Sequence, residues 1–208
     1  RLSRGCSMPA DLPLNGCDYL MLGFDYELRR HGYAGNSCQI RFTLERAISV
    51  ATLRQRVELL VNRYPILRAR PGGWFKTQWK PLTDAKAFPQ IRIHVEQSGL
   101  VERLCDEPLS VRDGELFRFD LIERSGGGMD VVFTWTHALM DAPSAEHFLA
   151  VVGREDVALP AITSVPPRPK KPLKERLLLA RKNVEQLTEF CKAAPRTVGV
   201  RFPTAPKS

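Results

Sequence analysis

Apolar residues recur along the chain at two different periods, which predict helices and strands. In residues 38–44 every second side chain is apolar, as in a strand with one buried face. In residues 50–63 the apolar side chains recur at steps of three and four, which is the period of a helix with one buried face. Ser49 can cap the start of this helix, and Pro65 ends it.

The same two periods predict the other elements before residue 154. Helices are expected at 17–31, near 99–107 and at 143–153, and strands at 66–71, 73–82, 89–97, 115–123 and 129–136. Three glycines, Gly126 to Gly128, separate the last two strands and can supply the positive φ values of a hairpin. Runs of strands without regular helical crossovers indicate the α+β class, with a mixed, largely antiparallel sheet and flanking helices.

The pattern changes after residue 153. Residues 154–172 contain five prolines and little apolar content, which indicates an extended linker. Residues 173–192 predict a helix with one narrow apolar stripe, which needs a partner. The stripe consists of Leu173, Leu177, Ala180, Val184, Leu187 and Cys191. We therefore divide the chain into a lobe at 1–153, a linker at 154–172, and a basic helix and tail at 173–208.

The net charge of +8 comes entirely from the C-terminal part. Residues 1–165 contain 20 Lys and Arg and 20 Asp and Glu, whereas residues 166–208 contain 11 and 3. A basic tail can bind nucleic acid or an anionic membrane. The tail has only two aromatic residues, Phe190 and Phe202, between its basic residues. We therefore favour a solvated face or a surface for an acidic partner over a nucleic-acid site.

The composition, 43% hydrophobic and 26% charged, is that of a globular protein. No apolar run approaches the roughly 20 residues of a membrane helix, and the first residues lack the apolar region of a signal peptide. The five cysteines are too widely spaced for a metal clip or a disulfide framework. We therefore expect a cytoplasmic protein with reduced thiols, in which Cys38 and Cys105 belong to the core.

A histidine, His137, directly follows the predicted strand at 129–136, and Asp141 comes four residues later. A base at the end of a buried strand is held by rigid scaffold and still faces a loop region that a substrate can reach. Imidazole is largely neutral near pH 7, as a proton acceptor must be. Asp141 could orient the turn or engage a distant cation. On spacing alone, a structural histidine beside a turn-forming aspartate is the favoured interpretation.

Other candidate residues fit structural roles better. His31 lies at a helix end, His94 inside a strand and His147 on a helix, and no pair of histidines has the spacing of a metal site. We expect no metal. Trp135 is expected to pack in the core under His137 or to line a channel that leads to it. Ser144 is expected to support the start of a helix, since no GxSxG elbow surrounds it.

The run THALMDA, residues 136–142, resembles the HHxxxDG signature of the superfamily of condensation domains and coenzyme-A-dependent acyltransferases. Residues 44–71 are similar to the N-terminal strand, helix and strand of that superfamily, and residues 144–149 match the helix after the signature. The resemblance covers roughly residues 12–195. It implies a chloramphenicol acetyltransferase-like fold.

By that resemblance, His137 corresponds to the second histidine of the signature. That histidine is the general base that assists an amine or hydroxyl in attacking a pantetheine-linked thioester. The implied activity is acyl transfer from coenzyme A or a carrier protein, with the acyl donor as substrate and no tightly bound cofactor. Asp141 corresponds to the aspartate that maintains the geometry of the site, usually through an arginine elsewhere in the chain.

The chain departs from the signature at two positions. Thr136 stands in place of the first histidine, and we expect its hydroxyl to form a hydrogen bond locally. Ala142 stands in place of the glycine, where its Cβ would shift the loop if the position needed a positive φ or a close approach of the backbone. These departures leave open a catalytically impaired module for binding or assembly. Relatives built as one chain have two lobes, so the resemblance implies an N-terminal lobe that is completed by a second lobe in the same or another chain, and possible binding of an acyl carrier protein.

Overall fold

A computed structural model describes residues 12–72, 78–82 and 89–154, together with residues 178, 181, 182, 185 and 189. The chain divides into two units, Arg1–Pro160 and Ala161–Ser208. The five described residues of the second unit are helical and exposed, as the helix predicted at 173–192 requires. The apolar stripe of that helix and nearly all of the proposed linker lie outside the described residues.

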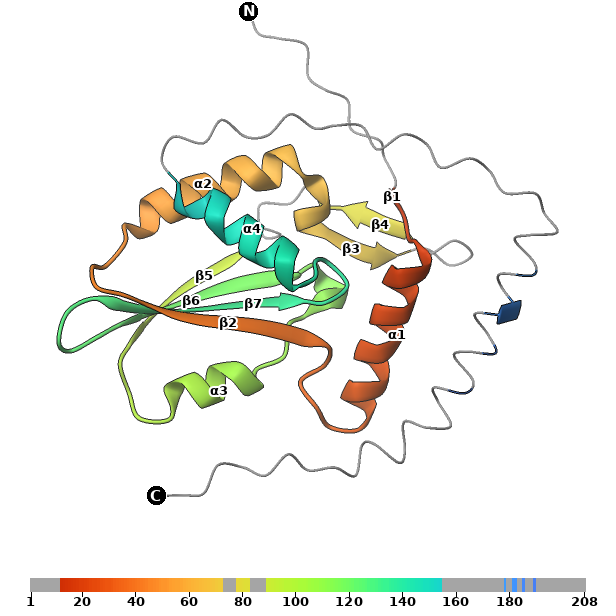
Figure 1. Ribbon diagram of the computed structural model, residues 1–208, viewed down its shortest axis with the longest axis horizontal. Helices are drawn as coiled ribbons and strands as arrows, with labels where there is room; N and C mark the ends of the chain where they lie inside the picture. Colours follow the sequence, from red (N-terminus) through yellow and green to blue (C-terminus); the bar gives the residue numbers. More distant parts are fainter. Residues whose placement is uncertain are drawn as a thin grey trace, which may run out of the picture. The chain divides into compact units, whose positions relative to one another are not determined.

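The first unit is organised around a four-stranded sheet in the order β2-β7-β6-β5 (Figure 1). Its strands are β2 (Ser37–Leu44), β7 (Met129–Thr136), β6 (Phe117–Glu123) and β5 (Gln90–Val95). β7 pairs antiparallel with both β2 and β6, and β5 lies parallel to β6. The predicted α+β class with a mixed, largely antiparallel sheet is therefore confirmed.

A second sheet has three short antiparallel strands in the order β1-β4-β3. They are β1 (Leu12–Pro13), β4 (Gln78–Pro81) and β3 (Ala69–Gly72). The strand predicted at 66–71 is wrong in its first half, because Pro65 begins a 3-10 turn, η1 (Pro65–Arg68), and extended structure starts only at Ala69. The two-residue strand β1 was not predicted.

Among the described residues of the first unit, four helices flank the sheets, and their ends agree with the predictions to within one residue. They are α1 (Gly16–Arg30), α2 (Val50–Arg63), α3 (Leu100–Asp106) and α4 (Ala142–Gly153), and a short 3-10 turn, η3 (Val111–Asp113), precedes β6. Ser49 caps α2 by accepting a hydrogen bond from the backbone N–H of Thr52, at 3.3 Å. In Figure 1, α2 and α4 cover one face of the main sheet and α3 lies on the other.

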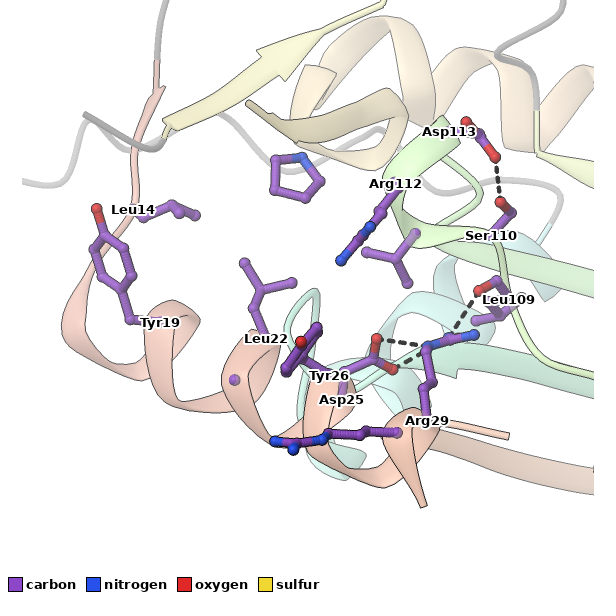
Figure 2. A pocket seen from close by; sticks show the side chains of 14 residues that line it. Leu14, Tyr19, Leu22, Asp25, Tyr26, Arg29, Leu109, Ser110, Arg112 and Asp113 are labelled. Carbon is purple, nitrogen blue, oxygen red and sulfur yellow. Dashed lines mark hydrogen bonds and ion pairs between the residues drawn. The ribbon is translucent and has the colours of Figure 1, made fainter. Parts of the chain in front are cut away.

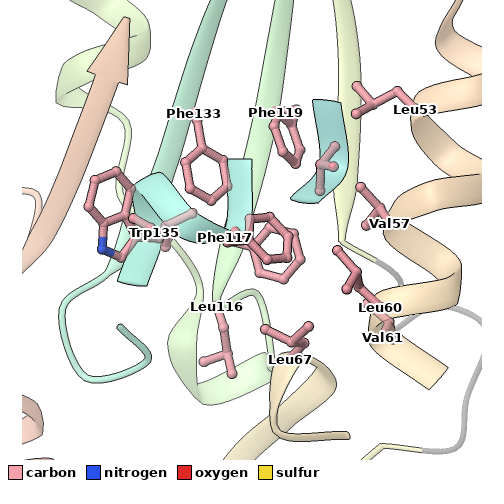
Figure 3. Packing of buried hydrophobic residues seen from close by; sticks show 14 of the residues in the cluster. Leu53, Val57, Leu60, Val61, Leu67, Leu116, Phe117, Phe119, Phe133 and Trp135 are labelled. Carbon is pink, nitrogen blue, oxygen red and sulfur yellow. The ribbon is translucent and has the colours of Figure 1, made fainter. Parts of the chain in front are cut away.

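The face of the main sheet under α2 and α4 is the hydrophobic core (Figure 3). Phe133 stacks on Phe148 of α4, with ring centroids 5.5 Å apart, and on Trp135, at 5.2 Å. Burying one such side chain stabilises the fold by about 1.5–3 kcal/mol. Because side chains alternate along a strand, the intervening residues of β6 and β7 face α3. That second face contains buried polar groups, including Arg118 and Asp120.

The hairpin between β6 and β7 uses the predicted glycines. Gly127 and Gly128 have φ values of 85° and 80°, which confirms the expected positive φ values at two of the three positions. A Cβ on Gly128 would lie 2.5 Å from the carbonyl oxygen of Leu44, at the end of β2. Gly128 is therefore required both for its backbone conformation and for the close approach of β2.

Candidate functional site

His137 lies directly after the last residue of β7 and is half-buried. The peptide turns back at once, because the N–H of Leu139 donates to the carbonyl oxygen of Thr136 at 2.9 Å. The backbone N–H of His137 donates to the carbonyl oxygen of Asn36 at 3.0 Å. Among the described residues the imidazole has no hydrogen-bond partner. Its nitrogens thus remain able to exchange a proton with a ligand.

Trp135 holds the other end of the turn that carries His137. Its side chain is 1% exposed, and its indole N–H donates to the carbonyl oxygen of Met140 at 2.9 Å. The ring packs on Phe133 in the core beneath the turn. The prediction that Trp135 packs under His137 is confirmed. The turn is therefore fixed at His137 by one hydrogen bond and at Met140 by another.

Asp141 is the N-cap of α4, and one of its carboxylate oxygens accepts a hydrogen bond from the backbone N–H of Ser144 at 3.0 Å. Hydrogen bonds from Ser144 hold the pKa of this carboxyl below its usual value. Within the described residues Asp141 has no ion pair with an arginine. The carboxylate orients the turn by capping the helix that follows, and Ser144 supports the helix start as predicted.

Ala142 is the first residue of α4 and has a negative φ, as does every described residue other than glycine. The glycine of the HHxxxDG signature is therefore not needed for its conformational freedom at this position. Of the two conditions under which the Cβ of Ala142 would shift the loop, the need for a positive φ is therefore not met.

The predicted local hydrogen bond of Thr136 is wrong. Its hydroxyl is buried and finds no partner among the described residues, and the same holds for the hydroxyls of Ser37 and Thr134. Ser37 is paired directly opposite Thr136 on β2, and Thr134 lies two residues away on the same sheet face. The three side chains lie on one face of the sheet near its end, and the pattern of alternating residues does not reveal that their hydroxyls lack hydrogen-bond partners.

A buried carboxylate from α1 also reaches the site, and sequence reasoning missed it. Asp25 is 8% exposed and accepts hydrogen bonds from Nε of Arg29 at 2.7 Å and from the backbone N–H of Asn36 at 2.8 Å. Asn36 is the residue whose carbonyl oxygen binds His137. The only local signal is an acid and an arginine four residues apart on a helix, a spacing that is common on exposed surfaces.

A cavity of about 900 Å³ lies beside Asp25, between α1, β3 and η3 (Figure 2). Leu14, Leu22 and Leu109 make part of its wall apolar, and Tyr19 and Tyr26 are also part of the lining. This volume is within the range of small-molecule sites, which are also lined mainly by apolar and aromatic groups. The ion pair of Asp25 with Arg29 forms part of its wall, so the cavity and the turn with His137 share a supporting residue.

A cluster of charged residues lies on the face of the sheet that α3 covers. The Asp120 carboxylate is fully buried and binds Nε of Arg92 at 2.6 Å, Nε2 of His94 at 2.8 Å and Nε of Arg118 at 3.1 Å. Arg92 also forms two hydrogen bonds with Glu107, at 2.6 and 2.9 Å. His94 thus contacts neighbouring side chains, one of the two outcomes predicted for it.

The remaining histidines and cysteines lie apart from the turn. His147 is exposed on α4, and His31 is exposed at the C-cap of α1, in agreement with their predicted structural roles. Cys38 and Cys105 are half-buried free thiols whose pKa values are raised by burial, and Cys38 packs against the main core. In the part of the chain that the structure describes, no three metal-binding side chains gather and no helix is long and apolar enough to cross a membrane.

No protein-family model and no curated protein matches the sequence. Solved structures do match. The starter condensation domain of rhizomide synthetase, in a variant form, is 12% identical with a TM-score of 0.55, over 69% of this chain and 34% of that one. The first condensation domain of the calcium-dependent antibiotic synthetase, bound to a substrate analogue, is 15% identical with a TM-score of 0.56, over 69% and 38%.

Two further matches carry bound small molecules. A four-domain nonribosomal peptide synthetase bound to AMP and glycine is 20% identical with a TM-score of 0.57, over 73% of this chain and 12% of that chain. A variant of the rhizomide synthetase starter domain in complex with C8-CoA is 11% identical with a TM-score of 0.54, over 69% and 35%. The chain spans only about a third of the length of the separate condensation domains that it matches. The described part of the first unit therefore has the fold of one lobe of a condensation domain.

Proposed function

We propose that the chain is the N-terminal lobe of an acyltransferase of the condensation type. In this proposal an acyl group passes from a thioester of coenzyme A or of carrier-protein pantetheine to an amine or a hydroxyl. His137 is the general base. The observation that carries the proposal is the position of His137, whose imidazole has no hydrogen-bond partner among the described residues and lies on a turn held at both ends.

The reaction needs one proton acceptor close to the nucleophile. His137 takes the proton from the acceptor N–H or O–H as the new bond to the thioester carbonyl carbon forms. The C–S bond then breaks, and the thiolate leaves and receives the proton from the imidazolium. The products are an amide or ester and a free thiol. No metal or redox partner is required for this balance.

The residues that follow His137 fit the role of holding it in place. Asp141 caps α4, so the turn and the helix keep a fixed relation. Ala142 causes no backbone strain at the position where the signature has glycine. These two observations favour a catalytic lobe over a module that only binds its ligand.

We further propose that a second lobe, in the same or another chain, completes the site, and that an acyl carrier protein can deliver the donor. The chain matches only about a third of the length of the separate condensation domains, which supports the need for a second lobe. Binding of C8-CoA by one similar domain supports coenzyme A thioesters as donors. A second lobe would also exclude water and so limit hydrolysis of the thioester.

The test uses the protein assembled with its second lobe and a panel of acyl thioesters with amine and alcohol acceptors. Thiol release and acylated product are measured together. Replacing His137 with alanine should lower turnover by about 10²–10⁴-fold, the usual contribution of a general base. His147→Ala is the matched control, because His147 is exposed on α4, and it should retain full turnover. Equal turnover in both variants would refute the role of His137, and thioester binding without turnover in the unmodified protein would favour a binding module.

A further inference from the structure

We propose that Asp25 is a positioning residue for His137, and that it acts through the backbone of Asn36. This inference rests on the proposed function, because it assigns a purpose to the accurate placement of the imidazole. It concerns a residue of α1 that lies outside the signature and more than 100 positions before His137 in the chain.

Two consecutive hydrogen bonds connect Asp25 to His137. Oδ1 of Asp25 accepts from the backbone N–H of Asn36 at 2.8 Å, and the carbonyl oxygen of Asn36 accepts from the N–H of His137 at 3.0 Å. Asn36 is therefore the single residue that connects the Asp25 carboxylate to the backbone of His137. A displacement of Asn36 would be passed directly to the backbone of His137.

The carboxylate itself is held rigidly. Arg29 approaches it with Nε at 2.7 Å from Oδ2 and a terminal nitrogen at 3.2 Å from Oδ1, a two-point contact that fixes the plane of the carboxylate. A terminal nitrogen of Arg29 also donates to the carbonyl oxygen of Leu109 at 2.8 Å. The pair is thus anchored both to α1 and to the segment before η3, so its position does not depend on α1 alone.

The hydrogen bond between Asp25 and Asn36 lies at the end of the β2–β7 ladder. The β2–β7 ladder ends at the pair of Ser37 with Thr136, and the bond from His137 to Asn36 continues it by one step. Backbone pairs at the end of a ladder open more easily than those in its centre. Gly35 has a φ of 102°, a conformation that side chains rarely allow, and it directs the N–H of Asn36 towards Asp25. Asp25 therefore holds the strand end next to the proposed base.

The experiment compares Asp25→Ala and Asp25→Asn in the assembled protein, with Glu27→Gln as the matched control. Glu27 is an exposed acid on the same helix, and its ion pair, with Arg30, is long at 3.9 Å. Asp25→Ala should lower kcat by about 10–100-fold, with a smaller change in KM, because a displaced base affects the chemical step. Asp25→Asn keeps an oxygen for Asn36 and should recover most of kcat.

A second readout does not depend on turnover. Amide hydrogen exchange of His137 should become about tenfold faster or more in Asp25→Ala, since the strand end opens more often. The control should match the unmodified protein in both measurements. A merely structural role of Asp25 would lower stability without a selective change at this amide or in kcat.

The outcomes separate the two proposals. If His137→Ala abolishes turnover while Asp25→Ala leaves kcat and the exchange of His137 unchanged, the positioning role is wrong and the function stands. If exchange rises in Asp25→Ala but His137→Ala retains turnover, the link exists and the proposed function fails. If Asp25→Ala does not fold, Asp25→Glu keeps the charge for Arg29 but moves the carboxylate by one methylene. Unchanged kcat and exchange in Asp25→Glu would then overturn the proposal.

Discussion

Replacing Trp135 with phenylalanine removes the indole N–H that holds Met140 and keeps an aromatic ring next to Phe133. The lost hydrogen bond, 2.9 Å long, accounts for about 1 kcal/mol. The side chain is 1% exposed, so the smaller ring leaves unfilled volume that costs about 1–2 kcal/mol more. The free energy of unfolding should therefore fall by about 2–3 kcal/mol.

The same substitution should affect turnover more than the stability change explains. The bond from His137 to Asn36 remains, but the turn loses its anchor at Met140. A displacement of about 1 Å in a catalytic group can cost on the order of 100-fold in rate. Because one of the two anchors is kept, we expect kcat to fall by about tenfold. Unfolding in urea gives the stability, and initial rates of thiol release, below the unfolding temperature, give kcat.

Phe119→Leu is the matched control for Trp135→Phe. Phe119 is 1% exposed, and its ring centroid is 4.7 Å from that of Phe133, on the same core face but away from the turn. It should lose about 1–2 kcal/mol of stability and keep its kcat. If the two variants have the same kcat when fully folded, the indole hydrogen bond does not hold the proposed base in place, and the reasoning is refuted.

Three further predictions concern stability. Asp120→Ala should lower the free energy of unfolding by about 3 kcal/mol, because the buried Arg118 loses its shortest ion pair and keeps only longer ones, to Glu115 at 3.4 Å and Glu107 at 3.5 Å, and a loss below about 1 kcal/mol in urea would contradict this. Gly128→Ala should cost about 1–3 kcal/mol, whereas Gly126→Ala, with open space around its Cβ, should change little; equal Tm values would refute the difference. An arginine of β5 lowers the pKa of the Glu107 carboxyl below its ordinary value of 4.5. The contribution of this carboxyl to the free energy of unfolding is therefore present above pH 4.5 and is lost as the pH falls below that value. Glu107→Gln should weaken this acid dependence in urea unfolding measured from pH 6 to about 3, and an unchanged dependence would disprove it.

The elements that local signals determine could be predicted from the sequence. α2 occupies the expected residues, because its N-cap, Ser49, and the proline that follows it act within one turn of the helix. β7 was also predicted at its observed residues, since its eight side chains are all buried and form a nearly continuous apolar run. His137 was found for the same reason, as the residue where that run ends.

Features that depend on contacts between distant segments could not be predicted. Asp25 looks like one more charge on a polar helix, and only the fold brings it to Asn36. Arg118 and Asp120 alternate with apolar residues as solvent-facing positions would, yet both are buried under α3. The buried hydroxyl of Thr136 has no hydrogen-bond partner among the described residues, which depends on the side chains that the fold places around it. In each case the missing information is the identity of the neighbour in space.

The pairing of β2 with β7 joins segments about 100 residues apart, which affects how the protein forms during synthesis. β7 lies between β2 and β6, so neither strand can pair with it until the ribosome has synthesised β7. Asn36 is made early, but its carbonyl oxygen can bind His137 only after the hairpin has entered the sheet. A nascent chain released before residue 136 would lack the turn that carries His137, and the edges of β2 and β6 that β7 covers would be open to aggregation.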